Sequence, residues 1–272
     1  MCDNNVYCII PSFNRLNELR NCIKQLNKQT FRNIKIVIVN DGSTDGTLEY
    51  LQDIEDNNFH FINGDGNLWW GKSINEGLKY VLDRAKNQDF ILLLNDDTYF
   101  DENFVQYFLN DHGDLERKII LGAYQADIDT KERTILGYKI NFLKTRINDN
   151  LICNGSETID ALPGRGLFFS FQTFKQIGLI NTKFFRQAMG DLEYTSRAKE
   201  KGINLKICEN AIVYTKSKSP DDTQMAQSFF KRLTSRFHNN SILLTFTFFC
   251  IRGPLFLRLW CLPRFIFFRI FR

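Results

Sequence analysis

Asp96 and Asp97 are adjacent carboxylates that follow an apolar run at residues 90–94 (FILLL) after one intervening residue, Asn95. A short apolar run bounded by polar residues is typical of a strand buried on both faces of a parallel sheet. Such a strand delivers the residues after it to the carboxyl edge of the sheet, where α/β folds bind their ligands. Two neighbouring carboxylates repel each other unless a positive group lies between them. A divalent metal that also binds a ligand phosphate is the candidate, and a solvated Asp-rich turn is the alternative.

The loops after two other predicted strands are also polar. The strand predicted over residues 6–11 (VYCIIP) leads into SFN, and the strand over 34–39 (IKIVIV) leads into NDGSTDGT, which contains the Asp-Gly pairs of turns. Ser43 or Thr44 is the candidate N-cap of the next helix. Because parallel strands end at one edge of a sheet, we expect these loops to meet Asp96 and Asp97 there, which favours a nucleotide site. No GxGxxG follows the first strand, and no Walker loop is present.

The segments between these strands show the periodicity of helices. Apolar residues recur at helical spacing within residues 15–28, and a second helix is predicted from about residue 71 to residue 85. A further strand is predicted over 59–63, so strands and helices alternate through residues 1–100. This order predicts βαβ units with right-handed crossovers, and therefore an α/β fold with a mostly parallel, Rossmann-like sheet flanked by helices.

The second half of the sequence is less regular. Strands are predicted over 119–126 and 134–142, arranged as a hairpin on the otherwise parallel sheet. The Gly-rich segment LPGRGLFF at 162–169 runs into a buried strand, and a short helix follows at 171–177. GDLE at 190–193 opens a helix that ends near Gly202, and by itself Asp191 reads as a cap of that helix. The last predicted strand covers 204–214.

Composition excludes several classes of site. With 272 residues and 43% apolar content, the chain has ample material for one α/β domain with or without an appendage. Its seven cysteines are scattered without a CxxC pair, which argues against a disulfide framework or a zinc site and for a reducing compartment. The three histidines lack the HExxH spacing. The start of the sequence lacks the features of a signal peptide, so we expect a cytoplasmic protein.

These segments together resemble the family 2 glycosyltransferases, enzymes of the GT-A fold. The matching segments cover about residues 6–215 in the family's order: CIIPSFNR, VIVNDGSTDGT, GNLWWGKSINEG, LLLNDDTYF, PGRGLFF and GDLEYTSRAKEKG. GNLWW followed by INEG resembles a bacterial subgroup that includes rhamnosyltransferases of surface polysaccharide assembly. The resemblance implies a nucleotide-sugar donor, UDP- or dTDP-linked and with rhamnose among the candidate sugars. It also implies a saccharide or lipid-linked oligosaccharide as the acceptor.

The resemblance also implies roles for residues at the donor side. Asp41 matches the carboxylate that contacts the base or ribose, and Asp96 and Asp97 match the DxD-like pair. A divalent Mg²⁺ or Mn²⁺ bound there would offset the charge on the leaving diphosphate. The implied donor-binding residues are Pro11, Phe13, Asp41, Asn67 and Asp96, and the implied metal ligand is Asp97.

On the acceptor side, Asp191 matches the family's general base, and one displacement with one base implies inversion at the anomeric carbon. The implied acceptor-binding residues are Trp69, Trp70, Arg165 and Glu193. For the tryptophans, core packing is the alternative to a sugar platform, and we expect one of each. Glu193 is expected to orient either the acceptor or Arg197, which is expected to be structural.

One departure from the family pattern concerns the end of the last strand. Many relatives carry a histidine there as a further metal or diphosphate ligand. Here Thr215 or Lys216 occupies that neighbourhood. Lys216 has the charge to hold a phosphate, but metal coordination from this end of the sheet is in doubt.

The sequence divides into a domain at 1–228 and a tail at 229–272. Within the domain, 1–100 is the expected nucleotide-binding half and 101–228 the acceptor-binding half. The tail carries eight basic residues, no acidic residue and eleven phenylalanines. Arginines and two prolines interrupt its apolar runs, so we expect it to bind an anionic membrane surface at the inner face without spanning it. A helical appendage that covers the core is the alternative, and nucleic acid is disfavoured because the phenylalanines cluster with aliphatic residues.

Two other functions compete with glycosyl transfer. A nucleotide-sugar-binding protein without turnover is consistent with the missing late histidine. A sugar-phosphate nucleotidyltransferase would share the sheet architecture, but it normally carries a loop rich in Gly and Lys or Arg after the first strand, unlike SFNR here.

Overall fold

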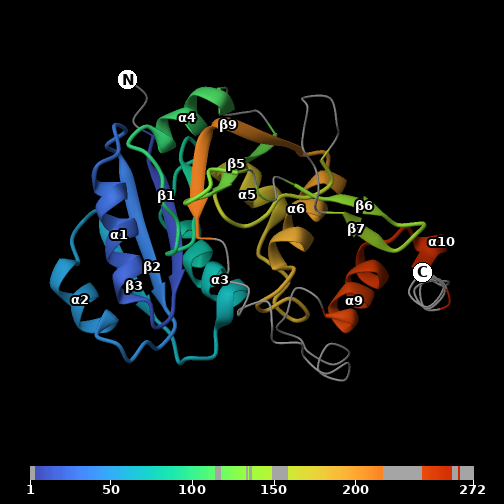
Figure 1. Ribbon diagram of the computed structural model, residues 1–272, viewed down its shortest axis with the longest axis horizontal. Coiled ribbons are helices and arrows are strands. Elements are labelled where there is room, and N and C mark those ends of the chain that lie inside the picture. The colour runs from blue at the N-terminus through green and yellow to red at the C-terminus, as the bar shows by residue number, and fades with distance from the viewer. Residues whose placement is uncertain are drawn as a thin grey trace.

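A seven-stranded sheet with helices on both faces forms the body of the protein (Figure 1). The computed structural model describes residues 4–113, 118–132, 134, 137–148, 159–216, 241–258 and 263. The strand order is β3-β2-β1-β4-β8-β5-β9. Its strands are β1 (Val6–Ser12), β2 (Ile34–Asn40), β3 (Phe59–Asn63), β4 (Phe90–Leu93), β5 (Ile119–Asp127), β8 (Leu167–Ser170) and β9 (Asn204–Thr215).

Alternating side chains of the strands enter two cores, one on each face of the sheet. Val6, Cys8 and Ile10 of β1 pack into one apolar cluster, whereas Tyr7 and Ile9 pack into the other. Residues from α1 (Leu16–Asn27), α2 (Thr47–Ile54) and α4 (Phe104–His112) complete the first cluster. Residues from α3 (Trp69–Leu82), α5 (Phe171–Ile177) and α6 (Gly190–Glu200) complete the second. The predicted βαβ architecture is confirmed.

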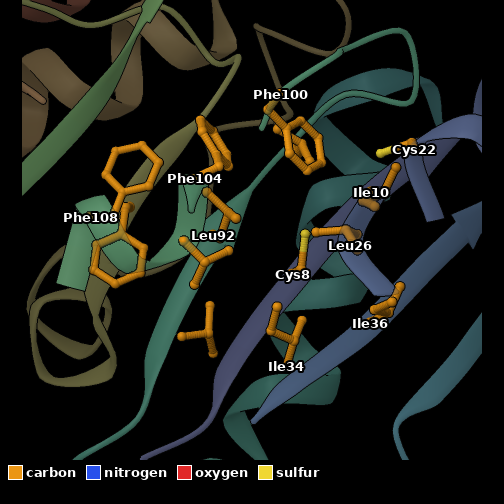
Figure 2. Packing of buried hydrophobic residues seen from close by; sticks show 14 of the residues in the cluster. Cys8, Ile10, Cys22, Leu26, Ile34, Ile36, Leu92, Phe100, Phe104 and Phe108 are labelled. Carbon is orange, nitrogen blue, oxygen red and sulfur yellow. The ribbon is translucent and has the colours of Figure 1, made fainter. Parts of the chain in front are cut away.

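Figure 2 shows the first of these cores at the side of β1, β2 and β4. Leu92 of β4 lies close to Phe104 and Phe108, whose rings meet edge to face at a centroid distance of 5.1 Å. Cys22 and Leu26 of α1 cover the neighbouring strands. The apolar run at 90–94 is therefore a strand buried on both faces, as its sequence indicates, and it fixes the position of the acidic residues that follow.

The strand directions bring four loops to one edge of the sheet. β1 pairs in parallel with β2 and with β4, so the loops after these strands share the carboxyl edge. β8 runs antiparallel to β4, which places the loop before β8 at that same edge. The backbone N–H of Gly166 in this loop donates to the carbonyl of Leu93 over 3.0 Å. The Gly-rich turn and the acidic pair are thus neighbours.

One local prediction is wrong and another holds only in part. β5 pairs with β8 and β9, and its end also exchanges backbone hydrogen bonds with the segment after it, from Thr134 N–H to the Gln125 carbonyl (3.0 Å) and from Asp127 N–H to the Glu132 carbonyl (2.9 Å), but residues 139–141 of the predicted hairpin strand do not pair with β5. Instead, β6 (Lys139–Asn141) pairs with β7 (Arg146–Asn148) in a separate ribbon. The N-cap of α2 is neither Ser43 nor Thr44, since the helix begins at Thr47 and Asp45 accepts the hydroxyl hydrogen of Thr47 over 2.5 Å.

In the described part of the tail, α9 packs against α6 and the β6–β7 ribbon. α9 (Ile242–Arg252) buries Leu244, Phe248 and Phe249 against Leu192 of α6 and other apolar residues. Arg252 is only 11% exposed and pairs with Glu193 and Glu200 of α6. α9 therefore covers part of the core, as the alternative of a helical appendage predicts, and binding of the tail to a membrane surface stays a prediction.

The tail continues from α9 into a short helix, α10 (Leu255–Arg258). Leu255 and Phe256 of α10 are 77% and 68% exposed. Among the residues that the structure describes, no helix has the length and apolar content needed to cross a membrane. The other parts of the predicted tail, 229–240, 259–262 and 264–272, lie outside the described residues.

Candidate active site

Asp96 and Asp97 lie at the carboxyl end of β4 with an arginine between them. The Nη1 atom of Arg15 donates to Asp96 Oδ1 over 3.2 Å and to Asp97 Oδ2 over 3.1 Å. A second arginine, Arg165, places its Nη2 atom 3.8 Å from the same Asp97 oxygen. The positive charge that the acidic pair requires thus comes from two side chains of the loops at this edge.

Burial gives the two carboxylates different environments. Asp96 is 4% exposed, whereas the side chain of Asp97 is 30% exposed. Burial raises the pKa of Asp96 to about 6, although Arg15 lowers this pKa and Asp97 raises it further. Asp96 is consequently ionised for the most part at neutral pH, and it gains or loses its charge in mildly acidic solution.

Two oxygens of the pair fit a divalent cation. Asp96 Oδ2 and Asp97 Oδ1 are buried without a hydrogen bond of good geometry, although the Ser12 hydroxyl is near enough to Asp96 to lower its pKa. A buried carboxylate oxygen without a partner is costly, and a cation would satisfy it. The described residues contain no cluster of three or more His, Cys, Asp or Glu side chains suited to a metal. Two carboxylates are nevertheless a common protein contribution to an Mg²⁺ site that phosphate and water complete.

Asp41 builds the loop beside the acidic pair. Its side chain is buried, and its two oxygens accept the backbone N–H groups of Gly66 (3.0 Å), Leu68 (3.0 Å) and Trp69 (2.9 Å). Gly42 stands at a φ of +69°, and a Cβ there would lie 2.8 Å from the nitrogen of Gly66. Asp41 therefore shapes the wall of the site, and its contact with a donor base or ribose stays a prediction.

The other predicted donor residues lie around this wall. Pro11 is half-buried within β1, opposite Val39 of β2. Phe13 is 51% exposed in the loop after β1, so its ring is accessible to a ligand. Asn67 is exposed on the loop that Asp41 organises. The structure brings these residues to the same edge as Asp96.

Asp191 lies in the first turn of α6, where its carboxylate is held by two backbone groups. Oδ2 accepts the N–H of Gly164 over 2.7 Å, and Oδ1 accepts the N–H of Leu192 over 2.8 Å. Burial raises the pKa of Asp191, while these two hydrogen bonds and Arg165 lower it. Each carboxylate oxygen has a further lone pair, so Asp191 keeps the capacity to accept a proton in a fixed orientation.

Gly164 lies where Asp191 and the ring of Trp70 meet. A Cβ at Gly164 would lie 2.8 Å from Cζ2 of Trp70 and 3.1 Å from Cβ of Asp191. The indole Nε1 of Trp70 donates to Asn95 Oδ1 over 3.1 Å, directly before the acidic pair. Any side chain at Gly164 would push these elements apart, so this position requires glycine.

The two tryptophans differ in their burial. Trp70 packs against the second core cluster through its ring. Trp69 stands at a φ of +58° and is 38% exposed. A non-glycine residue in this left-handed region is strained and is often retained for a reason other than stability. Trp69 is accordingly the better candidate for a sugar platform.

Glu193 and Arg197 form a structural pair on α6. Glu193 is 1% exposed, and Arg197 donates to its carboxylate over 2.9 Å. Arg197 also donates to the carbonyls of Ile177 (2.7 Å) and Leu179 (2.8 Å). Of the two roles expected for Glu193, the contacts support the orientation of Arg197. Its acceptor contact stays a prediction.

The end of β9 lies beside the segment that follows the acidic pair. Tyr99 and Tyr214 exchange backbone hydrogen bonds of 2.9 and 2.7 Å. Thr215, at 7% exposure, directly follows Tyr214 and therefore lies beside the segment after the acidic pair, although the two are far apart in the sequence.

Three residues of the site were not assigned a role from the sequence alone. Arg15, Asn95 and Gly164 lie within the quoted motifs, but nothing in their local pattern distinguishes them from loop residues. The place of Arg15 in the site is seen only from its contacts with the carboxylates of Asp96 and Asp97. A positive residue in the loop after the first strand, opposite an expected acidic pair, is the signal that was available.

Comparison with family models and with curated proteins gives a consistent result. The model described as Glycosyl transferase family 2 matches residues 7–175. An uncharacterized glycosyltransferase of Rickettsia felis is 32% identical over 197 residues, which are 65% of this chain and 29% of the relative. Glycosyltransferase GlyA of Streptococcus pneumoniae is 30% identical over 129 residues, which are 46% of this chain and 16% of the relative. The aligned parts thus span less than a third of the length of these relatives.

Solved structures with the same fold include three glycosyltransferases. GalNAc-T7 with UDP, GalNAc and Mn²⁺ has a TM-score of 0.64 at 11% identity, covering 79% of this chain and 44% of that one. Mannosyltransferase PcManGT of Pyrobaculum calidifontis, in complex with GDP-Man and Mn²⁺, has a TM-score of 0.63 at 11% identity, covering 97% and 73%. TarS 1–349 of S. aureus has a TM-score of 0.58 at 18% identity, covering 97% and 80%.

At these identities the structural likeness shows the fold alone, which is the GT-A arrangement of a mostly parallel sheet between helices. The family model supplies what the fold does not, because it matches well over half of the sequence and includes β1 through α5. The chain belongs to glycosyl transferase family 2.

Proposed function

We propose that this protein transfers a sugar from a nucleotide-sugar donor to an acceptor hydroxyl, with inversion at the anomeric carbon. One observation carries the proposal. The adjacent residues Gly164 and Arg165 contact Asp191 and Asp97 respectively. A carboxylate able to accept a proton and an acidic pair able to hold a leaving group are therefore attached to the same short loop, which is the arrangement that a single displacement requires.

The donor lies over the carboxyl edge of the sheet. Asp41 with its loop, Pro11 and Phe13 form the wall for the base and ribose, with Asn67 at its rim. Asp96 faces the ribose, and Asp97 with Asp96 would hold Mg²⁺ or Mn²⁺. A bound metal of this kind supplies Lewis-acid stabilisation of the diphosphate that leaves. The unpartnered oxygens of the acidic pair support this assignment.

The acceptor approaches from the side of α6. Asp191 takes the proton of the attacking hydroxyl, and its two backbone hydrogen bonds keep the carboxylate oriented toward the site. Trp69 offers an exposed ring for the acceptor sugar, and Arg165 contacts either the acceptor or a phosphate. The acceptor is a saccharide or a lipid-linked oligosaccharide of cell-surface polysaccharide synthesis. Rhamnose is the favoured candidate sugar because GNLWW with INEG resembles rhamnosyltransferases.

A donor screen tests the function. Purified protein is heated with UDP-, dTDP- and GDP-linked sugars in the presence and absence of Mn²⁺. A donor at about one hundred times its Kd adds about 2.7 kcal/mol, which raises the Tm by roughly 5–10 °C in a protein of this size. The released product is then identified after incubation with acceptor.

The product separates the competing functions. Release of a nucleoside diphosphate with a glycosylated acceptor supports the proposal. Release of pyrophosphate from a sugar phosphate and a nucleotide would identify a nucleotidyltransferase instead. A thermal shift without turnover on any saccharide or lipid-linked acceptor would favour a binding protein.

We also propose that the tail binds the anionic inner face of the cell membrane. The exposed Leu255 and Phe256, close to Arg258, support this placement. Anionic lipid attracts each nearby basic side chain by about 1 kcal/mol. The double variant Leu255→Gln, Phe256→Gln should therefore lose much of its binding to vesicles of phosphatidylglycerol, whereas Leu82→Gln, at an exposed leucine of α3, should bind as the unmodified chain does.

Co-sedimentation at low and high salt measures this binding. Equal sedimentation of the double variant and the unmodified chain, or equal binding to neutral phosphatidylcholine vesicles, contradicts the membrane proposal. These point variants keep α9, so its packing on α6 is not disturbed.

A further inference from the structure

Arg15 is placed where it shields the acidic pair before any ligand arrives. Its Nη1 atom contacts one oxygen of Asp96 and one oxygen of Asp97, at 3.2 and 3.1 Å. These are the oxygens Oδ1 of Asp96 and Oδ2 of Asp97, whereas the buried oxygens without partners are the other two. The guanidinium and a divalent cation would consequently face the same two carboxylates from different sides.

The backbone of Arg15 is held firmly by the neighbouring loop. The N–H of Asn14 donates to Ser43 Oγ over 2.9 Å, and the N–H of Thr44 donates to Asn14 Oδ1 over 2.8 Å. On the other side, the N–H of Leu16 donates to Asp45 Oδ2 over 2.9 Å. Arg15 is thus fixed at its Cα by contacts on both sides, at the start of α1.

The side chain of Arg15, in contrast, is half exposed and is held at its guanidinium end by the acidic pair. It is 51% exposed, and the hydrogen bonds of its guanidinium go to the acidic pair. Rotation about its side-chain bonds would carry the guanidinium several ångströms without moving the backbone. A diphosphate over the same edge would lie within reach, and a guanidinium binds phosphate oxygens at least as well as carboxylates.

The guanidinium of Arg15 and a divalent cation oppose each other's binding to the acidic pair unless an anion is bound as well. Asp96, Asp97, Arg15 and Arg165 together are neutral when all four are charged. A divalent cation added alone would meet an arginine already beside both carboxylates, and like charges at such separations repel strongly in a partly buried site. A nucleoside diphosphate brings the negative charge that accommodates both cations.

We propose that Arg15 makes metal binding conditional on the donor, by neutralising Asp96 and Asp97 in the free protein and moving to the donor's diphosphate when metal and donor bind together. The inference rests on the proposed function, because it takes the ligand to be a nucleoside diphosphate with a divalent cation. The consequence is that the metal binds weakly on its own and that a bound diphosphate strengthens the binding of the metal.

The affinity for Mn²⁺ alone is the decisive measurement. Free Mn²⁺ is titrated by electron paramagnetic resonance against the full chain, without nucleotide and then with UDP or the nucleoside diphosphate selected by the donor screen. Arg15→Gln should bind Mn²⁺ alone at least about tenfold more tightly than the unmodified chain, because one positive charge is removed. The same variant should bind the nucleoside diphosphate with Mn²⁺ at least about tenfold more weakly, because a charged phosphate contact is lost.

Two further variants separate the charge of Arg15 from other effects. Arg15→Lys keeps the charge and should bind Mn²⁺ alone nearly as weakly as the unmodified chain. Lys24→Gln removes an exposed positive charge from the same helix, α1, and should leave both affinities unchanged. A melting curve of each variant confirms that the fold is retained.

The outcomes distinguish this inference from the proposed function. Unchanged or weaker binding of Mn²⁺ alone by Arg15→Gln overturns the role of Arg15, even if the unmodified chain binds Mn²⁺ with a nucleoside diphosphate. Equal gains in Arg15→Gln and Lys24→Gln also overturn it, because the effect would then be a general one of charge. If no variant binds Mn²⁺ with any nucleoside diphosphate, the metal site of the proposed function fails and this inference fails with it.

Discussion

Replacement of Asp191 by asparagine should lower the rate of sugar transfer by about 10²–10⁴-fold, the usual contribution of a positioned general base. Asparagine keeps the size of the side chain but cannot take a proton from the acceptor hydroxyl. Donor binding should persist, since the acidic pair and the wall formed by Asp41 are unchanged. Initial rates of nucleoside diphosphate release and donor-induced thermal shifts, measured on the same preparation, separate the two effects.

Asp160 provides a matched control for this substitution. Its carboxylate also accepts a backbone N–H, that of Ile140 over 2.9 Å, and it pairs with Lys199 over 2.6 Å. Asp160→Asn should therefore retain nearly full transfer activity with at most a modest loss of stability. Full activity of the purified Asp191→Asn variant would remove Asp191 from the role of base.

The pH dependence of turnover offers a second view of the same carboxylate. Burial raises the pKa of Asp191, and the base must be ionised to act. Turnover should thus be lost as the pH falls through this raised pKa, at a higher pH than an ordinary aspartate with a pKa of about 3.9 would give. In the proposed assignment Asp96, whose pKa is about 6, contacts the donor, so its ionisation should appear in KM rather than in kcat at saturating donor. An acid limb of kcat below pH 4 would contradict the raised pKa of Asp191.

Removal of Asp97 should abolish transfer in a different way. In Asp97→Ala, Arg15 and Arg165 lose one of their carboxylate partners, and the oxygen available to a divalent cation disappears. We expect a loss of activity of more than about 10³-fold, because stabilisation of the leaving group is among the largest contributions to such reactions. The fold should be retained, since the Asp97 side chain is 30% exposed.

Metal titration distinguishes this loss from that of Asp191→Asn. The Asp97→Ala variant should show no increase in Tm when Mn²⁺ is added with a nucleoside diphosphate, whereas Asp191→Asn should respond as the unmodified chain does. Asp53→Ala, which removes an exposed aspartate of α2, serves as the control for the loss of one negative charge. A full metal response in Asp97→Ala would assign the metal to other residues.

The first half of the fold follows from the sequence because its signals are local. Continuous apolar runs mark β1, β2 and β4, and the polar residues after each run mark the shared edge where Asp41 and Asp96 lie. The position of β8 has no such local signal. An antiparallel strand inserted between β4 and β5 is chosen by long-range packing, and it alone brings Arg165 to Asp97.

The tail shows a different limit of sequence-based inference. A sequence of phenylalanines interrupted by arginines is compatible with a membrane surface and with a protein core. In both places the apolar rings are buried while the charged ends of the arginines can reach water or an acidic partner. The position of α9 on the core is decided by the pairing of Arg252 with Glu193 and Glu200. No sequence pattern in either segment predicts this pairing. Asp191 itself was predictable only through its motif, since as an isolated residue it resembles a helix cap.

The packing of α9 against α6 affects how the protein can be shortened for laboratory work. A chain shortened before residue 241, a common route to soluble preparations of membrane-associated enzymes, would uncover the apolar surface around Phe185 and Leu192. That surface supports the first turn of α6, where Asp191 is held. Precipitation or inactivity of such a shortened protein would then report the loss of support for α6, and could be mistaken for a need for lipid.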